Sequence, residues 1–186
     1  SNYGDLGCIE LGFALHSLRA VSPEMLDEAV SLVQEGPIHI HISEQLREVQ
    51  QCVEWSGKRP VEWLLDHSNL NERWCLIHAT HMTEEEIAAF AITGAVAGLC
   101  PTTEANLGDG VFPLDQFLSH GGRFGVGSDS NVSIDAAEEL RLLEYGQRLI
   151  QLRRNVGACG EGISCGASLF KAALDGGAQA LGQLVG

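Results

Sequence analysis

The stretch Ile38-His39-Ile40-His41-Ile42-Ser43-Glu44 decides how this chain is expected to fold. It is a short apolar run with only weak alternation, as expected of a parallel strand that is buried on both faces. The run ends in Ser43 and Glu44, residues that a purely structural strand would not choose. The stretch therefore predicts a parallel sheet with functional side chains at the carboxyl ends of its strands.

Four other runs resemble this one, and helix signals lie between them. The expected strands cover residues 10–15, 38–43, 74–78, 95–99 and 123–127. Helices are expected over 22–35, 60–66, from 83 onward, over 135–154 and over 164–174. Their starts are marked by caps, such as Ser22 before Pro23 and Thr83 with Glu86 in a capping box. This strand–helix alternation predicts a parallel α/β sheet in one domain, residues 1–186.

Two architectures satisfy the alternation: an open doubly wound sheet and a closed (β/α)8 barrel. Five strand–helix units suffice for a small open sheet. A complete barrel usually needs about 250 residues, whereas this chain has 186. Length alone favours the open sheet, so the choice between the two architectures depends on the polar motifs.

Composition narrows the classes of partner and the cellular location. The formal net charge of −14 disfavours nucleic acid and anionic membranes as partners, and an anionic substrate would need a local Arg or Lys. No apolar run approaches the ~20 residues of a membrane span, and the first residues do not have the pattern of a signal peptide. The six cysteines are scattered without a C-x-x-C pair, which indicates reduced thiols and a cytoplasmic location.

Polar residues follow the expected strands, and the second strand carries two histidines. His39 and His41 share a strand face, so one of the two is a candidate for a buried neighbour deeper in the sheet. A single strand-end histidine is also typical of a hydrogen-bonded core residue. Glu44 lies just past the strand, three residues after His41. A metal-binding histidine beside a carboxylate that moves protons suits hydrolysis.

His78 and Asp129 strengthen this hypothesis, because imidazole and carboxylate are ligands that suit zinc or iron. Asp129 lies in Gly-Ser-Asp-Ser and could instead cap the following helix. His81 is ambiguous, since it lies just before the Thr83 cap. The remaining histidines, His67 and His120, are expected on the surface.

The first strand ends in His16, with Arg19 three residues later. An arginine matches a carboxylate with two parallel hydrogen bonds, so Arg19 is a candidate anion anchor. A structural salt bridge at a helix entry is the alternative. After the fourth strand, residues 101–110 are expected to form a loop that either rims a pocket or is a plain connection.

The order His-x-x-Glu, then His, then Gly-Ser-Asp at successive strand ends resembles the amidohydrolase superfamily, and more narrowly its aminohydrolase branch. The stretches HSLRAVSPE, HIHISEQ, WCLIHATH, TEANLGDGVFP and GSDSNVSI are together similar to the formimidoylglutamate deiminase family of histidine degradation. The broader branch reads more like P-x-S-N after the fourth strand, where this chain has the narrower family's Thr103-Glu104-Ala105-Asn106. The resemblance extends from about Gly12 to Leu181.

The resemblance implies a (β/α)8 TIM-type barrel of a metal-dependent hydrolase, with only strands 4 to 8 present. His41 would be a ligand of a divalent metal on the fifth barrel strand, and Asp129 a ligand on the eighth. Zinc is the favoured metal, with iron as the alternative. Glu44 would move protons, and His78, with Asp129, would help to activate the attacking water.

The implied reaction is hydrolytic deimination of N-formimino-L-glutamate to N-formyl-L-glutamate and ammonia. His16 and Arg19 would bind this small dicarboxylate substrate, which agrees with the anion argument made from Arg19 alone. A homo-oligomer is expected for the full-length form. The alternatives are a guanine- or cytosine-type deaminase, and a barrel fragment that is not catalytic as given.

The sequence departs from the family's pattern in one large respect. The first-strand H-x-H motif that supplies two metal ligands has no counterpart, because His39-Ile40-His41 belongs to the fifth barrel strand. Counterparts of the first three strands and of a small β-sandwich are also absent. The chain is therefore expected to be a fragment that is inactive on its own.

Overall fold

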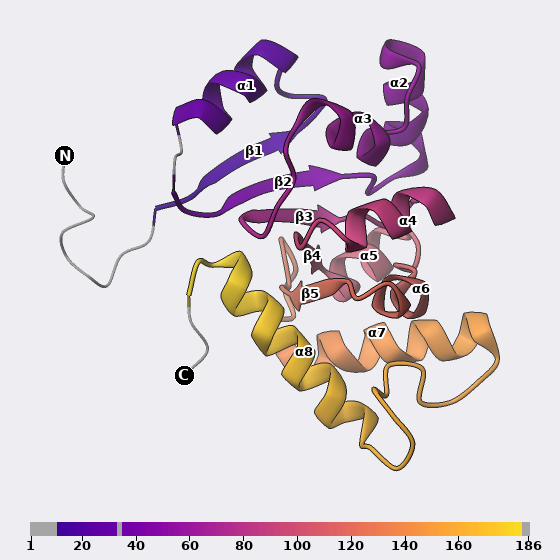
Figure 1. Cartoon of the computed structure of the whole chain (residues 1–186). Helices are drawn as coiled ribbons and strands as arrows, with labels where there is room; N and C mark the ends of the chain where they lie inside the picture. Colours follow the sequence, from indigo (N-terminus) through magenta and orange to yellow (C-terminus); the bar gives the residue numbers. More distant parts are fainter. Residues whose placement is uncertain (1–10, 33–34, 184–186) are drawn as a thin grey trace.

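The computed structural model describes residues 11–32 and 35–183, which are built around one sheet of five parallel strands (Figure 1). The strands are β1 Phe13–Ser17, β2 Ile38–Ile42, β3 Trp74–His78, β4 Val96–Leu99 and β5 Arg123–Val126. Each strand pairs with the next one along the chain. In a doubly wound sheet the strand order reverses at a switch point, whereas in a (β/α)8 barrel it is sequential. The sequential order confirms the barrel topology and corrects the preference based on length alone.

The described part of the chain has eight helices, six of them between the strands and two, α7 and α8, after β5. They are α1 Pro23–Leu32, α2 Leu46–Ser56, α3 Pro60–His67, α4 Glu84–Ala91, α5 Pro101–Leu107, α6 Leu114–Ser119, α7 Ala136–Gln151 and α8 Cys165–Ala180. One face of the sheet forms the main core with these helices. Ile40, Leu76 and Phe124 of the strands are there packed with Phe90 of α4 and Phe117 of α6.

Helix α8 crosses the sheet at the starts of the strands (Figure 1). The Gln179 side chain donates to the carbonyls of Glu72 and Gly94, which precede β3 and β4, at 2.9 and 2.8 Å. Gly176 lies against the backbone of Phe124, and a Cβ at this glycine would stand 2.1 Å from the Phe124 oxygen. The helix therefore covers the amino-terminal edge of the sheet and leaves the carboxyl-terminal edge to the strand-end loops.

Several element boundaries differ from the sequence-based expectation. Strand β1 begins at Phe13, and Glu10 of the expected strand lies outside the described residues. Helix α7 ends at Gln151, and α8 continues to Ala180, whereas α1 is described to Leu32 and the expected continuation over 33–34 lies outside the described residues. Helices α2 and α6 were not predicted.

The expected loop over residues 101–110 is wrong in its first part, because residues 101–107 form α5. Pro101 at the helix start and Gly108 at the C-cap, with φ of 72°, are ordinary helix boundaries. Thr102 is buried, and its backbone N–H and hydroxyl both donate to Glu139 of α7, at 2.9 and 2.5 Å. Polar residues thus enter the interior here through fully formed hydrogen bonds.

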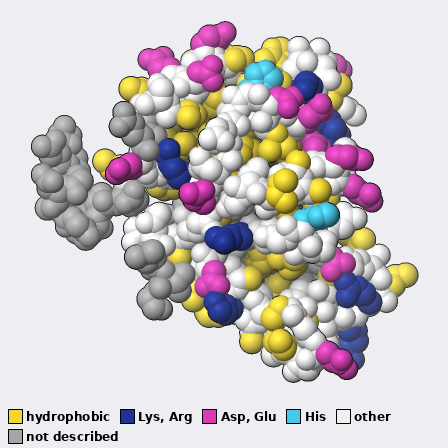
Figure 2. All heavy atoms as spheres, in the orientation of Figure 1, with side chains coloured by type: hydrophobic (Ala, Val, Ile, Leu, Met, Phe, Trp, Pro, Cys, Tyr) yellow, Lys and Arg dark blue, Asp and Glu magenta, His cyan; other side chains and the backbone are white. Residues whose placement is uncertain are grey.

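The cysteines in the described part are free thiols, and Cys75 and Cys100 are buried as expected. Burial raises the pKa of Cys75 to about 12 and also raises that of Cys100. In Figure 2 the lysines and arginines stand in small groups separated by acidic and uncharged side chains. Within the described residues, no helix has the length and apolarity to cross a membrane.

Candidate active site

The structure brings the expected site residues from four strands together at the carboxyl-terminal edge. The rings of His16 and His41 have centroids 5.3 Å apart, and those of His41 and His78 are 5.7 Å apart. Nε2 of His78 is 3.7 Å from Oε1 of Glu44 and 3.8 Å from Oδ2 of Asp129. Three imidazoles and two carboxylates thus converge on one region.

The backbone at these strand ends is unusual. Left-handed φ angles of 48° to 68° occur at the non-glycine residues His16, Ser43, His78, Ala79 and Asp129. Such a conformation costs of order 1 kcal/mol or more at each residue and is concentrated at functional sites. It turns the chain sharply as each strand ends, which is what directs successive strand-end side chains toward a common region.

A register shift in β1 creates the contact between His16 and His41. Ala14 pairs with His39 and Ser17 pairs with His41, so β1 has one extra residue between the two pairs. This bulge directs the His16 carbonyl at Nδ1 of His41, which donates to it at 2.7 Å. With Nδ1 protonated, Nε2 of His41 keeps its lone pair for a ligand.

His78 is held by a carboxylate that sequence reasoning missed. Its Nδ1 lies 3.2 Å from Oε1 of Glu104, which also accepts the Cys100 backbone N–H at 3.0 Å. His78 is 1% exposed and Glu104 3% exposed, so this pair is shielded from solvent. The sequence signal was a glutamate in the first turn of an unrecognised helix.

The surroundings of His78 also shift its pKa. Burial lowers the pKa of His78, but the hydrogen bond to Glu104 and the carboxylates of Glu44 and Asp129 together raise it above its ordinary value. The ring is therefore an effective proton acceptor whose Nε2 faces two carboxylates.

Glu44 is placed beside other acids. Burial raises the pKa of Glu44, nearby His78 opposes the rise, and Asp109 and Glu48 add to it. Asp109, also missed from the sequence, accepts a hydrogen bond from the Gln45 side chain at 3.0 Å. A carboxyl group with a raised pKa is suited to carry a proton near neutral pH.

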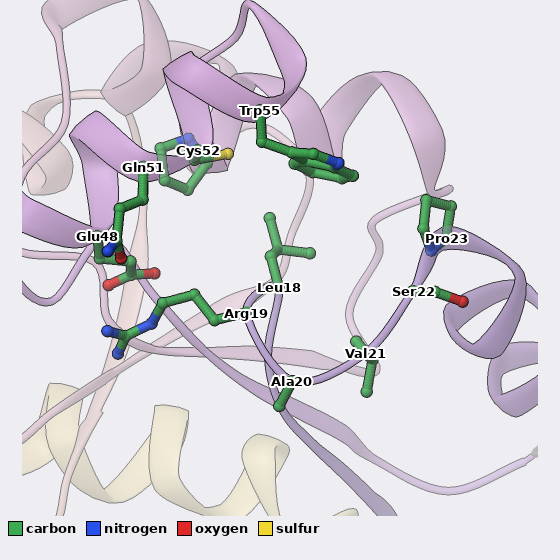
Figure 3. Close-up of a pocket in the computed structure, with 11 residues that line it drawn as sticks. Leu18, Arg19, Ala20, Val21, Ser22, Pro23, Glu48, Gln51, Cys52 and Trp55 are labelled. Carbon is green, nitrogen blue, oxygen red and sulfur yellow. The ribbon is translucent and has the colours of Figure 1, made fainter.

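Arg19 lies at a neighbouring cavity of about 570 Å³ (Figure 3). The lining residues are Leu18, Arg19, Ala20, Val21, Ser22, Pro23, Glu48, Gln51, Cys52, Trp55 and Pro60. The Arg19 guanidinium points toward Glu48 and Gln51 (Figure 3). No ion pair of Arg19 is found within 4 Å among the described residues, so the alternative of a structural salt bridge is not supported.

His39, His67 and His120 lie apart from this cluster. Nε2 of His39 lies 2.7 Å from the Ala180 carbonyl of α8, so His39 is the deeper neighbour of the two strand histidines. His67 is exposed and stacks on Trp63, with ring centroids 3.9 Å apart, and His120 is exposed after α6. These observations confirm the expected surface positions of His67 and His120.

Comparison with known proteins assigns the family. Residues 6–162 match the model of the Amidohydrolase family, and the chain belongs to this family.

Individual members of the family show how similar this chain is to particular proteins. The chain is 53% identical over 177 residues to formimidoylglutamate deiminase of Pseudomonas aeruginosa, covering 95% of this chain and 39% of that protein. A crystal structure of an amidohydrolase from Brucella melitensis matches with a TM-score of 0.93 and 57% identity, over 97% of this chain and 40% of that one. An adenosine deaminase of Xanthomonas campestris, solved with bound zinc, matches with a TM-score of 0.82 and 26% identity over 92% and 38% of the two chains.

The chain thus spans about two fifths of the length of the relatives it matches, and its five strands are part of their barrel.

Proposed function

We propose that these residues form part of the active site of a metal-dependent hydrolase that deiminates N-formimino-L-glutamate to N-formyl-L-glutamate and ammonia. The observation that carries the proposal is His78, which is fixed on one side by Glu104 and faces Glu44 and Asp129 on the other. The 53% identity to the Pseudomonas aeruginosa deiminase supports this substrate over other amidines.

The donor atoms fit part of a metal site. His41 has Nε2 free, and Asp129 offers a carboxylate, a combination that suits zinc and also accepts iron. Among the described residues, no group of three His, Cys, Asp or Glu side chains is placed to hold a metal ion. We therefore propose His41 and Asp129 as two of the ligands, with the others supplied from outside the described residues. When bound, such a metal lowers the pKa of water and polarises the substrate.

The side chains divide the proton transfers between them. Nε2 of His78 and Oδ2 of Asp129 lie 3.8 Å apart and face the same space, where we assign them together to accept the proton of the attacking water. The departing nitrogen needs two protons to leave as ammonia. Glu44, 3.7 Å from the same imidazole nitrogen, passes on its own proton and then the proton of the hydroxyl on the tetrahedral carbon, whose C–N bond breaks as the C=O bond forms. The raised pKa of Glu44 suits this second role.

The substrate's carboxylates would be recognised by Arg19, with His16 beside it at the end of β1. Arg19 is exposed and has no ion pair among the described residues, so its guanidinium is available to an anion. In a chain with a net charge of −14, such a local cation is what a dicarboxylate requires.

The main test is ammonia release from N-formimino-L-glutamate by a polypeptide of the relatives' length that carries this sequence. The Glu44→Gln variant removes the proton carrier and keeps the shape, so kcat should fall about 10³-fold. Undiminished turnover in this variant would contradict the role assigned to Glu44, and no turnover by the unaltered protein would contradict the reaction.

The rival is a guanine- or cytosine-type deaminase with the same chemistry. A neutral heterocycle needs no carboxylate anchor, so Arg19→Met distinguishes the two. For the dicarboxylate, KM should rise about 100-fold with a smaller change in kcat. An unchanged KM would favour the rival.

A second rival is a barrel fragment that is not catalytic as given. Metal analysis of the 186 residues alone tests it, because two proposed ligands are too few for a tight catalytic zinc site. Stoichiometric zinc with activity would contradict the fragment hypothesis.

We further propose that the form of the relatives' length is a cytoplasmic homo-oligomer with no nucleic-acid or membrane partner. Size-exclusion chromatography with light scattering tests its oligomeric state.

A further inference from the structure

The turn that carries Glu44 is held by a second glutamate, Glu48. Its Oε1 accepts the Ser43 backbone N–H at 3.0 Å, and its Oε2 accepts the Glu44 backbone N–H at 2.9 Å. Glu48 lies in the first turn of α2 and is 3% exposed. The two carboxylate oxygens therefore each bind one of the two residues that directly follow β2.

These two hydrogen bonds hold Ser43 in a strained backbone conformation. Ser43 has a φ of 51°, a left-handed angle that an unsupported non-glycine residue rarely keeps. Hydrogen bonds from N–H groups to a carboxylate are roughly twice as strong as bonds between neutral groups, and burial strengthens them further. Glu48 thus has the placement and the strength to keep Ser43 in this conformation.

Glu144 of α7 is a second buried glutamate that accepts hydrogen bonds from two successive backbone N–H groups. Its Oε1 accepts the Val156 N–H at 3.0 Å and its Oε2 accepts the Gly157 N–H at 2.9 Å, and it is 4% exposed. Glu144 also pairs with Arg148 at 2.7 Å. Glu48 forms no ion pair within 4 Å among the described residues, although the Arg19 guanidinium points toward it (Figure 3), so its two N–H bonds are the contacts that hold the buried carboxylate.

We infer that Glu48 is a positioning residue for Glu44: it holds the left-handed turn that presents the Glu44 carboxylate to His78. This inference rests on the proposed function, because it assigns Glu48 a role through Glu44. The geometry of the turn connects Glu48 to the chemistry, because the 3.7 Å approach of Glu44 to His78 depends on where the backbone of Glu44 is held. A displacement of about 1 Å in such a group is enough to lower kcat about 100-fold.

The test compares Glu48→Gln with the matched control Glu144→Gln in a polypeptide of the relatives' length. An amide can accept only one of the two N–H bonds and opposes the other with its own NH2 group. We expect Glu48→Gln to lower kcat about 30- to 100-fold with KM changed less than about threefold. Glu144→Gln, with the same burial and the same kind of bonds, should keep kcat within about twofold while lowering the thermal midpoint.

A double-mutant cycle separates positioning from general loss of structure. In the Glu44→Gln background the group being positioned is gone, so adding Glu48→Gln should lower kcat by no more than about twofold. Multiplicative losses in the cycle, or equal kcat losses in Glu48→Gln and Glu144→Gln, would overturn the inference. If Glu48→Gln fails to fold, Glu48→Asp is measured in the same way, and failure of both to fold would assign Glu48 a purely structural role.

Failure of the proposed function is recognised separately. An unaltered protein that releases no ammonia from N-formimino-L-glutamate overturns that function, and the role of Glu48 with it. An active unaltered protein whose Glu48→Gln variant behaves like the Glu144→Gln variant overturns the positioning role alone.

Discussion

The two edges of the sheet are built by opposite means, and a single strand shows the contrast. His39 and His41 point to the same face of β2, two residues apart. His39 is bonded to the Ala180 carbonyl of α8 at the amino-terminal edge, whereas His41 is bonded to the His16 carbonyl of a bulged strand at the other edge. The first contact fastens a helix, and the second orients a ring that keeps one nitrogen free.

The same difference holds along each edge. At the amino-terminal edge a glycine allows close backbone contact with α8, and a glutamine side chain bonds to two carbonyls. The carboxyl-terminal edge instead combines left-handed residues with buried carboxylates, which are costly unless every bond is made. The contacts at the first edge therefore favour stability, whereas the second edge carries the residues that we propose for the chemistry, as in barrel enzymes generally.

The largest expected effect is on stability and comes from Gly176→Ala. A Cβ there would lie 2.1 Å from the Phe124 oxygen, so α8 must shift away from β5. We expect the free energy of unfolding in urea to fall by about 3 kcal/mol. Gly177→Ala is the control, since a Cβ there meets nothing within 4 Å and alanine favours the helix by about 1 kcal/mol. Equal effects of the two variants would contradict a stabilising role for the close contact between Gly176 and Phe124.

Glu104→Gln tests the opposite edge through activity. The amide weakens the hold on Nδ1 of His78, so we expect kcat to fall about 30-fold, equivalent to about 2 kcal/mol in the activation free energy. Glu139→Gln serves as control, because Glu139 is as buried but bonds Thr102 rather than a histidine. Equal losses of kcat in the two variants would contradict a specific role for Glu104.

Much of this arrangement could be predicted from residue types. Strands rich in apolar residues and capped helices are local signals, which is why β3 was predicted at its observed bounds, Trp74–His78, and why the Thr83–Glu86 capping box is present. The residues at strand ends were identified because His, Glu and Asp are uncommon there. Their convergence follows from the parallel topology, in which every strand ends at the same edge.

The residues that were missed act through burial and long-range contact, which a local pattern does not reveal. Glu104 and Glu48 were hidden because each lies in the first turn of a helix that the sequence did not indicate. A glutamate in the first turn is common in exposed helices, because its negative charge interacts favourably with the positive end of the helix dipole. Only the structure shows that these two are 3% exposed and bonded to strand-end groups.

A smaller effect is expected from Gln179→Ala at the amino-terminal edge. This side chain donates to two carbonyls and accepts from Arg123 at 2.7 Å, but it lies near the surface, where water replaces part of what is lost. We expect a loss of about 1 kcal/mol in the free energy of unfolding, with kcat unchanged. A change in kcat without a change in stability would mean that the two edges are not separate in function.

The smallest expected effect is a change of stability with pH, and it tests whether the segment between α7 and α8 is held by a charged carboxylate. Burial alone would raise the pKa of Glu144, but the hydrogen bonds from Arg148 and from the Gly157 and Val156 backbones outweigh it and hold the pKa below its ordinary value. A carboxyl group with a lowered pKa in the folded state contributes stability that is complete above the unfolded value, about 4.3, and that is lost as the pH falls through the folded value.

The Glu144→Gln variant should therefore be less stable than the unaltered chain at pH 7, and the difference should shrink as the pH is lowered below about 4. Urea midpoints measured from pH 7 to pH 3 give both slopes, with the exposed residue Glu54, changed to Gln, as control. If the difference stayed constant over this range, the carboxylate charge would not be what holds residues 156–157. The segment between α7 and α8 would then be held by shape, like the Gly176 contact, and would need no ionised group.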